Sequence, residues 1–354
     1  MTYLVALKPL THDTKLNSYA VLLEIDWEKQ IVKRSLKIPS ANFTSNSGYM
    51  RSHIQGLTLI ESKIYISLWN FIVIVDYNTF EVFDSFSHPL MSDLHGIEAT
   101  DNKLLVCSTG IDTLLCFDRS NHELDWFWRP DDSDLSKKIK VPRFFGSLMS
   151  KTSLFPVILN KFRVRDGIIQ RIKLGFKNRE YRGVDKTRSK MHFHHLNEVN
   201  VIGDRIFVLT KGWNNSVDSS LIEIGFSSRS NPTFIALPGS FKGAHDIVFK
   251  DNSIFVTESH TESVGQILMN KKHDVNHWKL TNNNFFIRGM CVTTDESFIV
   301  GFTPSRKSAD FSGRQPILRE YNSTFTEIKK EFKLKNFYTD SVGGAVHCIK
   351  KVYL

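Results

Sequence analysis

The stretch Leu94-His95-Gly96-Ile97 recurs along the chain in altered form, as a large polar residue at the start of an apolar segment. Its counterparts are His195-Leu196-Asn197-Glu198-Val199, Ala244-His245-Asp246-Ile247, Ile287-Arg288-Gly289-Met290 and Val346-His347-Cys348-Ile349. Because each stretch opens a predicted β-strand, repeats that close into a ring would bring the polar openers together on one axis. The repeat therefore predicts a ring-shaped fold and places its functional site on that axis.

The spacing from each opener to the next apolar segment is regular. That segment begins nine residues after the opener in the units that start at Gln55, His95, Asn197 and His245. The unit of Arg288 needs one extra residue, which a longer turn would absorb. The connecting turns, Asp101-Asn102, Gly203-Asp204 and Asp251-Asn252, tolerate the left-handed backbone of a tight hairpin. Four short strands in roughly 40 residues are the repeat of a β-propeller blade.

The two ends of the chain predict how the ring closes. The last unit has only an innermost strand, Val346–Leu354, whereas the N-terminal part supplies three strands without a polar opener, at 2–7, 19–25 and 30–38. A blade shared between the two ends would remove the edges left open between the first and last blades. We therefore expect residues 1–354 to form a single all-β domain, a six-bladed β-propeller closed by a shared N- and C-terminal blade.

One segment interrupts the repeat. Residues 131–190 form an insertion between the third and fourth blades, counting the shared blade first, and contain sixteen Lys or Arg residues and six acidic ones. Their net charge is +10, against +9 for the whole chain. One interpretation is a lid that attracts an anionic substrate to the axis. A second is a membrane-surface element on acidic headgroups, and a third is a solvated excursion. Without a recognisable binding module, we expect no nucleic-acid partner.

Composition and local motifs restrict the remaining possibilities. The four cysteines fall within predicted strands without C-x-x-C spacing, which favours buried thiols. The chain has neither a secretory N-terminus nor a run of about 18 apolar residues. We therefore expect a cytoplasmic protein, which would be membrane-peripheral if the insertion contacts lipid. The absence of P-loop, Rossmann and G-x-S-x-G motifs from the sequence disfavours nucleotide hydrolysis and serine-hydrolase chemistry.

The openers fall into two layers, because residues two apart on a strand face the same way. The lower layer is Gln55, His95, Asn197, His245, Arg288 and His347. The upper layer is His53, Asp93, His195, Gly243, Phe286 and Ala345. In the adjoining run 191–195, His194 is expected to point away from the channel, and His192 could reach its rim.

Several neutral imidazoles with few carboxylates favour a transition metal (iron, manganese, zinc, copper or nickel) over calcium or magnesium. The predicted metal ligands are His95, His245, His347 and His195. The predicted substrate-binding residues are Arg288, Arg306, Gln55 and His53. The predicted catalytic residues are Arg288, His195, Asn197 and Asp93. The leading hypothesis is thus a metal-dependent enzyme that acts on a small anionic substrate.

Two alternatives remain open. In the first, the site is metal-free, and a channel histidine acts as general base or nucleophile in group transfer while Arg288 binds an anionic group. In the second, the protein is a non-catalytic scaffold that binds a protein or an anionic membrane through residues 131–190. The polar ring would then be structural.

Short motifs carry a resemblance to known propellers. The segments 94–97, 108–112, 126–128 and 195–199 resemble propellers of the aryl-sulfate sulfotransferase-like type, which pair a tryptophan-bearing outer strand with a His-x-Asn opener. The pair Arg288-Gly289-Met290 and Val300-Gly301-x-x-x-x-Arg306 is similar to uncharacterised bacterial propellers with an Arg-Gly-Leu and Val-Gly-x-Ser-x-x-Arg pattern. The first resemblance implies that a channel histidine takes the sulfuryl group while an arginine binds it, and His195, His245 and Arg288 are the positions available for these roles.

Overall fold

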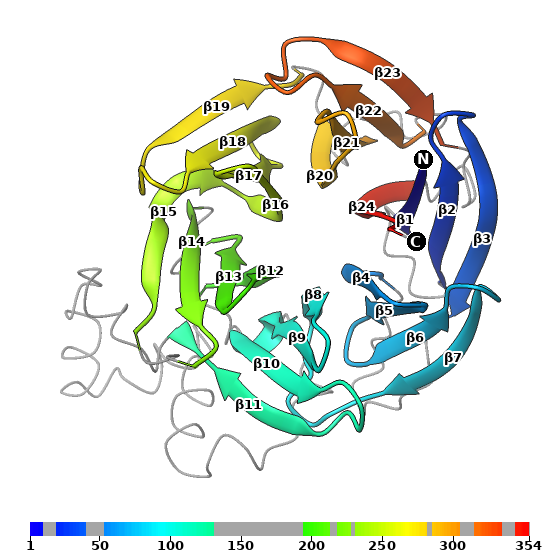
Figure 1. Ribbon diagram of the computed structural model, residues 1–354, viewed down its shortest axis with the longest axis vertical. Helices are drawn as coiled ribbons and strands as arrows, with labels where there is room; N and C mark the ends of the chain where they lie inside the picture. The colour runs from blue at the N-terminus through cyan, green and yellow to red at the C-terminus, as the bar shows by residue number, and fades with distance from the viewer. Residues whose placement is uncertain are drawn as a thin grey trace, which may run out of the picture.

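The computed structural model forms a ring of six sheets around a central axis, each with four antiparallel strands (Figure 1). The residues that it describes are 1–9, 19–39, 53–130, 194–212, 218–227, 231–281, 285–304, 315–334 and 344–353. The fold is the six-bladed β-propeller that the polar openers and their spacing predict.

The first blade is built from both ends of the chain, as predicted. Its strands, from the axis outward, are β24 (Gly344–Lys351), β1 (Thr2–Pro9), β2 (Tyr19–Asp26) and β3 (Ile31–Pro39). Because β1 pairs with both β24 and β2, the two ends of the chain lie side by side (Figure 1). The C-terminal strand thus completes the sheet that the N-terminal strands begin.

The other five blades follow one another along the chain, and in each the first strand lies nearest the axis (Figure 1). The second blade contains β4 (Gly56–Ile60), β5 (Lys63–Ser67), β6 (Ile72–Asp76) and β7 (Glu81–Phe86). The third contains β8 (Leu94–Ala99), β9 (Lys103–Ser108), β10 (Thr113–Asp118) and β11 (Leu124–Trp128), with a short 3-10 helix, η1 (Thr109–Ile111), before β10. The fourth contains β12 (Leu196–Ile202), β13 (Arg205–Thr210), β14 (Asp218–Gly225) and β15 (Thr233–Lys242). The fifth contains β16 (Ala244–Lys250), β17 (Ser253–Glu258), β18 (Ser263–Leu268) and β19 (Val275–Lys279). The sixth contains β20 (Phe285–Val292), β21 (Phe298–Pro304), β22 (Ile317–Tyr321) and β23 (Ile328–Lys333).

Packing between neighbouring blades supplies the core. Strands in the middle of a blade, such as β17, are buried along their whole length, whereas the outer strand β7 is exposed along most of its length. Buried apolar side chains form six clusters, one between each pair of adjacent blades. Burial of apolar surface between the blades therefore stabilises the ring.

A β-bulge distorts the inner strand of five blades, and each bulge contains the polar opener. In β8 the pairing with β9 jumps from Leu94 to Ile97, so that His95 and Gly96 lie outside the regular ladder. The equivalent irregularities lie at Asn197, at His245 and Asp246, at Arg288 and Gly289, and at His347. Because a bulge bends the strand and redirects its side chains, it aims these openers independently of the regular alternation.

Hydrogen bonds from side-chain hydroxyl groups connect several inner strands to the preceding blade. Ser67, at the end of β5, donates a hydrogen bond to the carbonyl oxygen of His95 on β8. The same link runs from Thr109 to Leu196, from Ser259 to Ile287 and from Thr303 to Val346. Each link fixes the backbone at or beside a polar opener, which restricts the directions that the opener's side chain can take.

The predicted insertion, residues 131–190, lies outside the described residues, between β11 of the third blade and β12 of the fourth. All four cysteines are buried and free, as their spacing indicates. In the described part of the chain, the structure has no helix able to span a membrane.

Candidate functional site

The structure brings the predicted lower layer together around the axis. Of its six side chains, those of Gln55, His95, Asn197, His245 and His347 are buried. Asn197 joins two of the histidines, since its Oδ1 lies 2.7 Å from His95 Nδ1 and its Nδ2 lies 2.6 Å from His245 Nδ1. The ring centroids of His95 and His347 are 6.5 Å apart. Openers that are far apart in sequence thus form one polar ring.

The hydrogen bonds of Asn197 assign the protons of two imidazoles. Its Nδ2 donates to the carbonyl oxygen of Ala244 at 2.7 Å, which fixes the orientation of the amide. The amide oxygen therefore accepts a hydrogen bond from His95 Nδ1–H, and His245 Nδ1 accepts one from Nδ2. In neutral His245 the ring proton must then be on Nε2. That nitrogen is a hydrogen-bond donor in this arrangement and has no lone pair for a metal.

His245 and His347 are neutral at neutral pH. Burial holds the pKa of His245 well below its usual range, and the positive charges of Arg288 and Lys211 lower it further. Burial also lowers the pKa of His347 well below its usual range, with Lys8 and Arg288 adding to the effect. Within the described part of the chain, Nε2 of each ring is buried without a hydrogen-bond partner. These atoms can contact a bound polar molecule.

Residues of the predicted upper layer also reach the axis. Asp93 is buried, and its Oδ1 lies 3.7 Å from His95 Nε2. The ring of His195 lies 5.0 Å from that of His95, edge to face. The backbone N–H groups of His194 and His195 donate to the carboxylate of Asp112, which fixes the start of β12. His95 is therefore held between a carboxylate and an amide.

The upper layer reaches the axis by a different route from the one that the sequence suggests. Asp93, His195 and Gly243 precede their inner strands and have positive φ angles of 49°, 51° and 64°. A residue in the left-handed backbone conformation therefore orients each of these positions, rather than the alternation of side chains along a strand. His53 is buried, and its proximity contributes to the lowered pKa of His347.

A cavity of about 270 Å³ lies at the upper layer of the axis. Its lining residues are Lys8, Lys211, His260, Phe286, Arg288, Thr303 and Ala345, and we call it the cationic mouth. Phe286 and Ala345 are predicted upper-layer residues, and Arg288 is the predicted substrate-binding residue. Three cationic side chains from three blades converge on this cavity, which favours an anion.

Four residues of the cationic mouth, Lys8, Lys211, His260 and Thr303, are not among the residues predicted from the sequence. Lys8 lies near the end of β1 and Lys211 directly follows β13, so a search of second strands for terminal cations would find both. His260 comes from the turn after β17, and its ring occupies the space that a side chain at Gly243 would need. A Cβ at Gly243 would lie 1.9 Å from His260 Cδ2. Gly243, the one glycine of the predicted upper layer, is the sequence signal for a side chain that enters from elsewhere.

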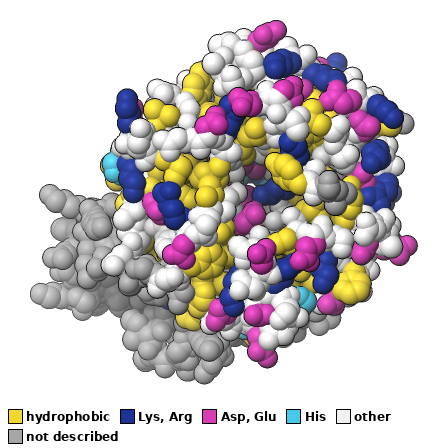
Figure 2. Space-filling view, in the orientation of Figure 1, with side chains coloured by type: hydrophobic (Ala, Val, Ile, Leu, Met, Phe, Trp, Pro, Cys, Tyr) yellow, Lys and Arg dark blue, Asp and Glu magenta, His cyan; other side chains and the backbone are white. Residues whose placement is uncertain are grey.

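Acidic side chains gather further along the inner strands, and we call them, with Lys350, the lower acidic cluster (Glu98, Glu198, Asp246 and Lys350). Lys350 Nζ lies 3.1 Å from Glu98 Oε2. Burial raises the pKa of Glu198 well above its usual range, against the opposing effect of Lys350. Burial also raises the pKa of Asp246. Charged side chains near the centre of the ring are visible on the face shown in Figure 2.

The predicted transition-metal site depends on the arrangement of the described histidines. Among the described residues, no group of three or more His, Cys, Asp or Glu side chains is placed to hold a metal ion. The assigned tautomer of His245 leaves its second, buried ring nitrogen protonated, and a metal ligand needs a free lone pair. The ligand set His95, His195, His245 and His347 stays a prediction. Arg306 and His192 lie outside the described residues.

Comparison with known proteins supports the fold alone. No protein-family model and no curated protein matches this sequence. A protein of unknown function from Bacteroides caccae aligns over 98% of this chain and 97% of its own, with a TM-score of 0.57 and 9% identity. A structure of a nidogen/laminin complex aligns over 99% and 97%, with a TM-score of 0.55 and 8% identity. A streptogramin B lyase aligns over 98% and 90%, with a TM-score of 0.51 and 10% identity. The resemblance to sulfotransferase-like propellers is not shown by these comparisons. The chain therefore shares a propeller fold with these proteins.

Proposed function

We propose that this protein binds a small anionic molecule, with a carboxylate, sulfate or phosphate group, in the cationic mouth. The observation that carries the proposal is the convergence of Lys8, Lys211 and Arg288 on one cavity. Like charges in a confined space of low dielectric repel one another, and a bound anion offsets that repulsion. The adjacent imidazoles of His245 and His347 add no charge, because both are neutral at neutral pH.

The side chains of the mouth have distinct parts in this proposal. The guanidinium of Arg288 offers paired donors that match a carboxylate, sulfate or phosphate, and the two lysines act as point charges. Beside them, His95 is oriented by Asp93 and Asn197 and can exchange a proton with a bound molecule. Asp93 and Asn197 are positioning residues here. This arrangement supports the metal-free alternative, with group transfer as the reaction class that it would suit.

Calorimetric titration with inorganic phosphate and sulfate tests the proposal. At pH 7 and low ionic strength, the protein should bind one anion per chain, and Arg288→Met should weaken binding by about 30-fold. Arg205→Met is the matched control, because Arg205 pairs with Glu223 on the fourth blade and lies outside the mouth. Non-saturable binding, or equal affinity in Arg288→Met, would reject the proposal.

A transition-metal enzyme is the second candidate. Its support is the pair of buried Nε2 atoms on His245 and His347, which lack partners in the described structure. A metal at His245 Nε2 would require the other tautomer and therefore a different hydrogen bond to Asn197. Elemental analysis of protein purified without a histidine tag should then find one metal per chain, lost in His245→Ala and His347→Ala. A metal content near zero would reject this candidate.

The scaffold alternative and the cytoplasmic location also stay predictions. Residues 131–190, which would contact a protein or an anionic membrane, lie outside the described residues. If the scaffold alternative holds, deletion of the insertion should abolish binding to anionic liposomes or to a protein partner. Replacement of Arg288 should then have no effect on that binding.

A further inference from the structure

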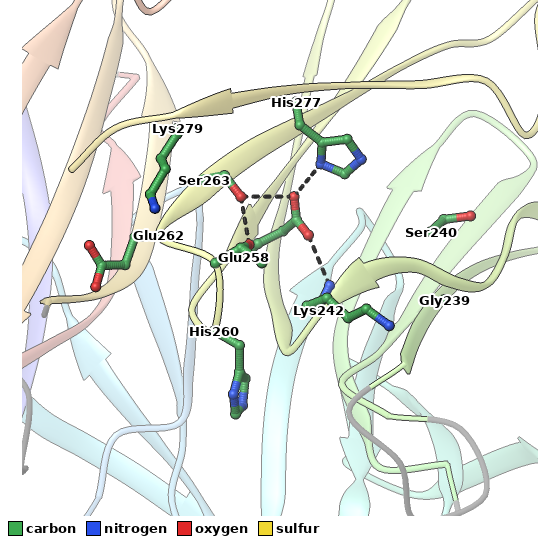
Figure 3. Close-up of a pocket in the computed structure, with 10 residues that line it drawn as sticks. Gly239, Ser240, Lys242, Glu258, His260, Glu262, Ser263, His277 and Lys279 are labelled. Atoms are coloured by element: carbon green, nitrogen blue, oxygen red, sulfur yellow. Dashed lines mark hydrogen bonds and ion pairs between the residues drawn. The ribbon is translucent and has the colours of Figure 1, made fainter. Parts of the chain in front are cut away.

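A second cavity, of about 650 Å³, lies between the fourth and fifth blades (Figure 3) and shares His260 with the cationic mouth. Its walls come from the end of β15, the ends of β17 and β19, and the turn between β17 and β18. We call it the blade-five cleft. Its side chains that bear on ligand binding are those of Lys242, Glu258, His260, Ser263, His277 and Lys279.

Glu258 is the fixed centre of the blade-five cleft. Its side chain is buried, and its carboxylate accepts hydrogen bonds from the backbone N–H of Lys242 at 2.8 Å and the hydroxyl of Ser263 at 3.1 Å. It also accepts one from Nδ1 of His277 at 2.6 Å. The imidazole is thereby held by one nitrogen, while its other nitrogen points away from Glu258 (Figure 3). With 43% of its side chain exposed, His277 presents a fixed polar group to the cleft.

No large apolar side chain is among the described residues that line the blade-five cleft. Each described residue that lines it is a glycine, serine, threonine, lysine, histidine or glutamate, whereas the cationic mouth includes Phe286 and Ala345. Most pockets for small organic ligands are lined mainly by apolar side chains. An apolar ligand body would leave these polar groups without partners, at a cost in free energy. A body rich in hydroxyl groups would instead offer each of them a hydrogen bond.

His260 connects the two cavities. Among the described residues, it alone lines both the cationic mouth and the blade-five cleft. Its ring extends away from the Glu258–His277 pair (Figure 3) and lies directly against Gly243, the upper-layer position of the fifth blade. The imidazole therefore stands where the two cavities meet, and a ligand that occupies both would pass it.

We propose that the cationic mouth and the blade-five cleft are two parts of one binding site for a phosphate or sulfate ester of a sugar. This inference rests on the proposed function, because it places the ester group among Lys8, Lys211 and Arg288. The sugar hydroxyls then lie in the cleft, where the imidazole of His277 and the ammonium group of Lys279 form hydrogen bonds with them. His260 contacts the ligand at the junction between its two parts.

Competition calorimetry against inorganic phosphate tests this assignment. The probes are glucose 6-phosphate, galactose 6-phosphate and N-acetylglucosamine 6-sulfate, with phenyl phosphate as the ester that has an apolar body. At least one sugar ester should bind about tenfold more tightly than inorganic phosphate, and phenyl phosphate should bind no more tightly than it. His277→Ala and Lys279→Ala should each remove most of the advantage of the sugar ester. Lys271→Ala, an exposed lysine of the same blade outside the cleft, should leave that advantage unchanged.

The outcomes separate this inference from the proposed function. If phosphate binds but every sugar ester binds equally or more weakly, the two-part site is rejected and the anion site in the mouth stands. The same follows if His277→Ala and Lys279→Ala do not change the ratio of the two affinities. If neither phosphate nor any ester binds, both proposals are rejected.

Discussion

The cationic mouth and the lower acidic cluster lie on the same axis, yet they arrange charge in opposite ways. In the mouth, Lys8, Lys211 and Arg288 share one cavity, so like charges lie near one another. In the lower acidic cluster, Lys350 pairs with Glu98 at 3.1 Å. Opposite charges that pair within the protein contribute to its stability, whereas grouped like charges are stabilised by a ligand of the other sign. Under the proposed function, the mouth binds an anion, whereas the Lys350–Glu98 ion pair contributes to folding.

Reversal of one charge in the mouth should have the largest effect on binding. Arg288→Glu removes a cation and adds a carboxylate, and phosphate affinity should fall by more than about 100-fold in a calorimetric titration. Lys350→Met removes a cation from the lower acidic cluster and should change that affinity by less than about twofold, once folding is verified. Equal losses in the two variants would show that the axis attracts anions through its overall charge.

Stability should show the opposite order. Lys350→Met leaves Glu98 and Glu198 without their cation, and the free energy of unfolding in urea should fall by about 2 kcal/mol. Arg288→Met relieves repulsion in the mouth and should change the free energy of unfolding by less than about 0.5 kcal/mol. A larger loss for Arg288→Met than for Lys350→Met would contradict the division between binding and folding.

His245, beside the mouth, and Glu198, in the lower acidic cluster, should change the stability with opposite signs as the pH falls. The pKa of His245 is lowered by folding, so below pH ~6.5 the unfolded chain binds a proton that the folded chain does not. The contribution of His245 to stability should therefore fall by up to about 1.4 kcal/mol for each pH unit below that point. The pKa of Glu198 is raised by folding, so the folded chain takes up a proton first as the pH falls, and the contribution of Glu198 should rise.

These two contributions can be separated by difference. Urea unfolding of the wild type, His245→Gln and Glu198→Gln between pH 7 and 5 gives the stability of the wild type minus that of each variant. As the pH falls, this difference should decrease for His245→Gln and increase for Glu198→Gln. The same sign in both series would refute the assigned pKa shifts.

A smaller effect on stability and on phosphate affinity is expected from substitution of Gly243, which lies against the ring of His260. Gly243→Ala places a Cβ against the imidazole at a φ of 64°, which should cost about 1 kcal/mol of stability and weaken phosphate binding about threefold. Gly203→Ala is the matched control, because Gly203 has a φ of 57° and no atom near the added Cβ. The backbone strain of alanine at a positive φ angle is then common to both variants. If the two variants lose the same stability and keep the same affinity for phosphate, the position of the His260 ring does not affect anion binding in the mouth.

Sequence alone predicts the blades because their pattern is local. The openers at His95 and Asn197, nine residues before the next apolar segment, indicate the hairpins, and the incomplete units at the two ends predict the shared blade. The bulges are not predictable in this way, since a register shift such as that from Leu94 to Ile97 depends on the partner strand. The openers converge on the axis as predicted, but bulges and turns orient their side chains, rather than the alternation of a regular strand.

The composition of the mouth depends on contacts between blades and is less accessible to sequence reasoning. Lys8, Lys211 and His260 come from second strands or their turns, and only the closed ring brings them beside Arg288. The tautomer of His245 follows from the carbonyl of Ala244, through the amide of Asn197. A list of residue types cannot convey that information, which bears directly on whether His245 Nε2 is a hydrogen-bond donor or a metal ligand.

An anomalous difference map from crystals grown with low concentrations of sodium selenate would test the central claim most directly. Selenium scatters anomalously, and the selenate ion has the charge and shape of sulfate. The account predicts a strong peak in the cationic mouth, within hydrogen-bond distance of the Arg288 guanidinium and of at least one of Lys8 and Lys211, and its loss in Arg288→Met crystals. Selenate bound only at the protein surface, with none in the mouth, would contradict it.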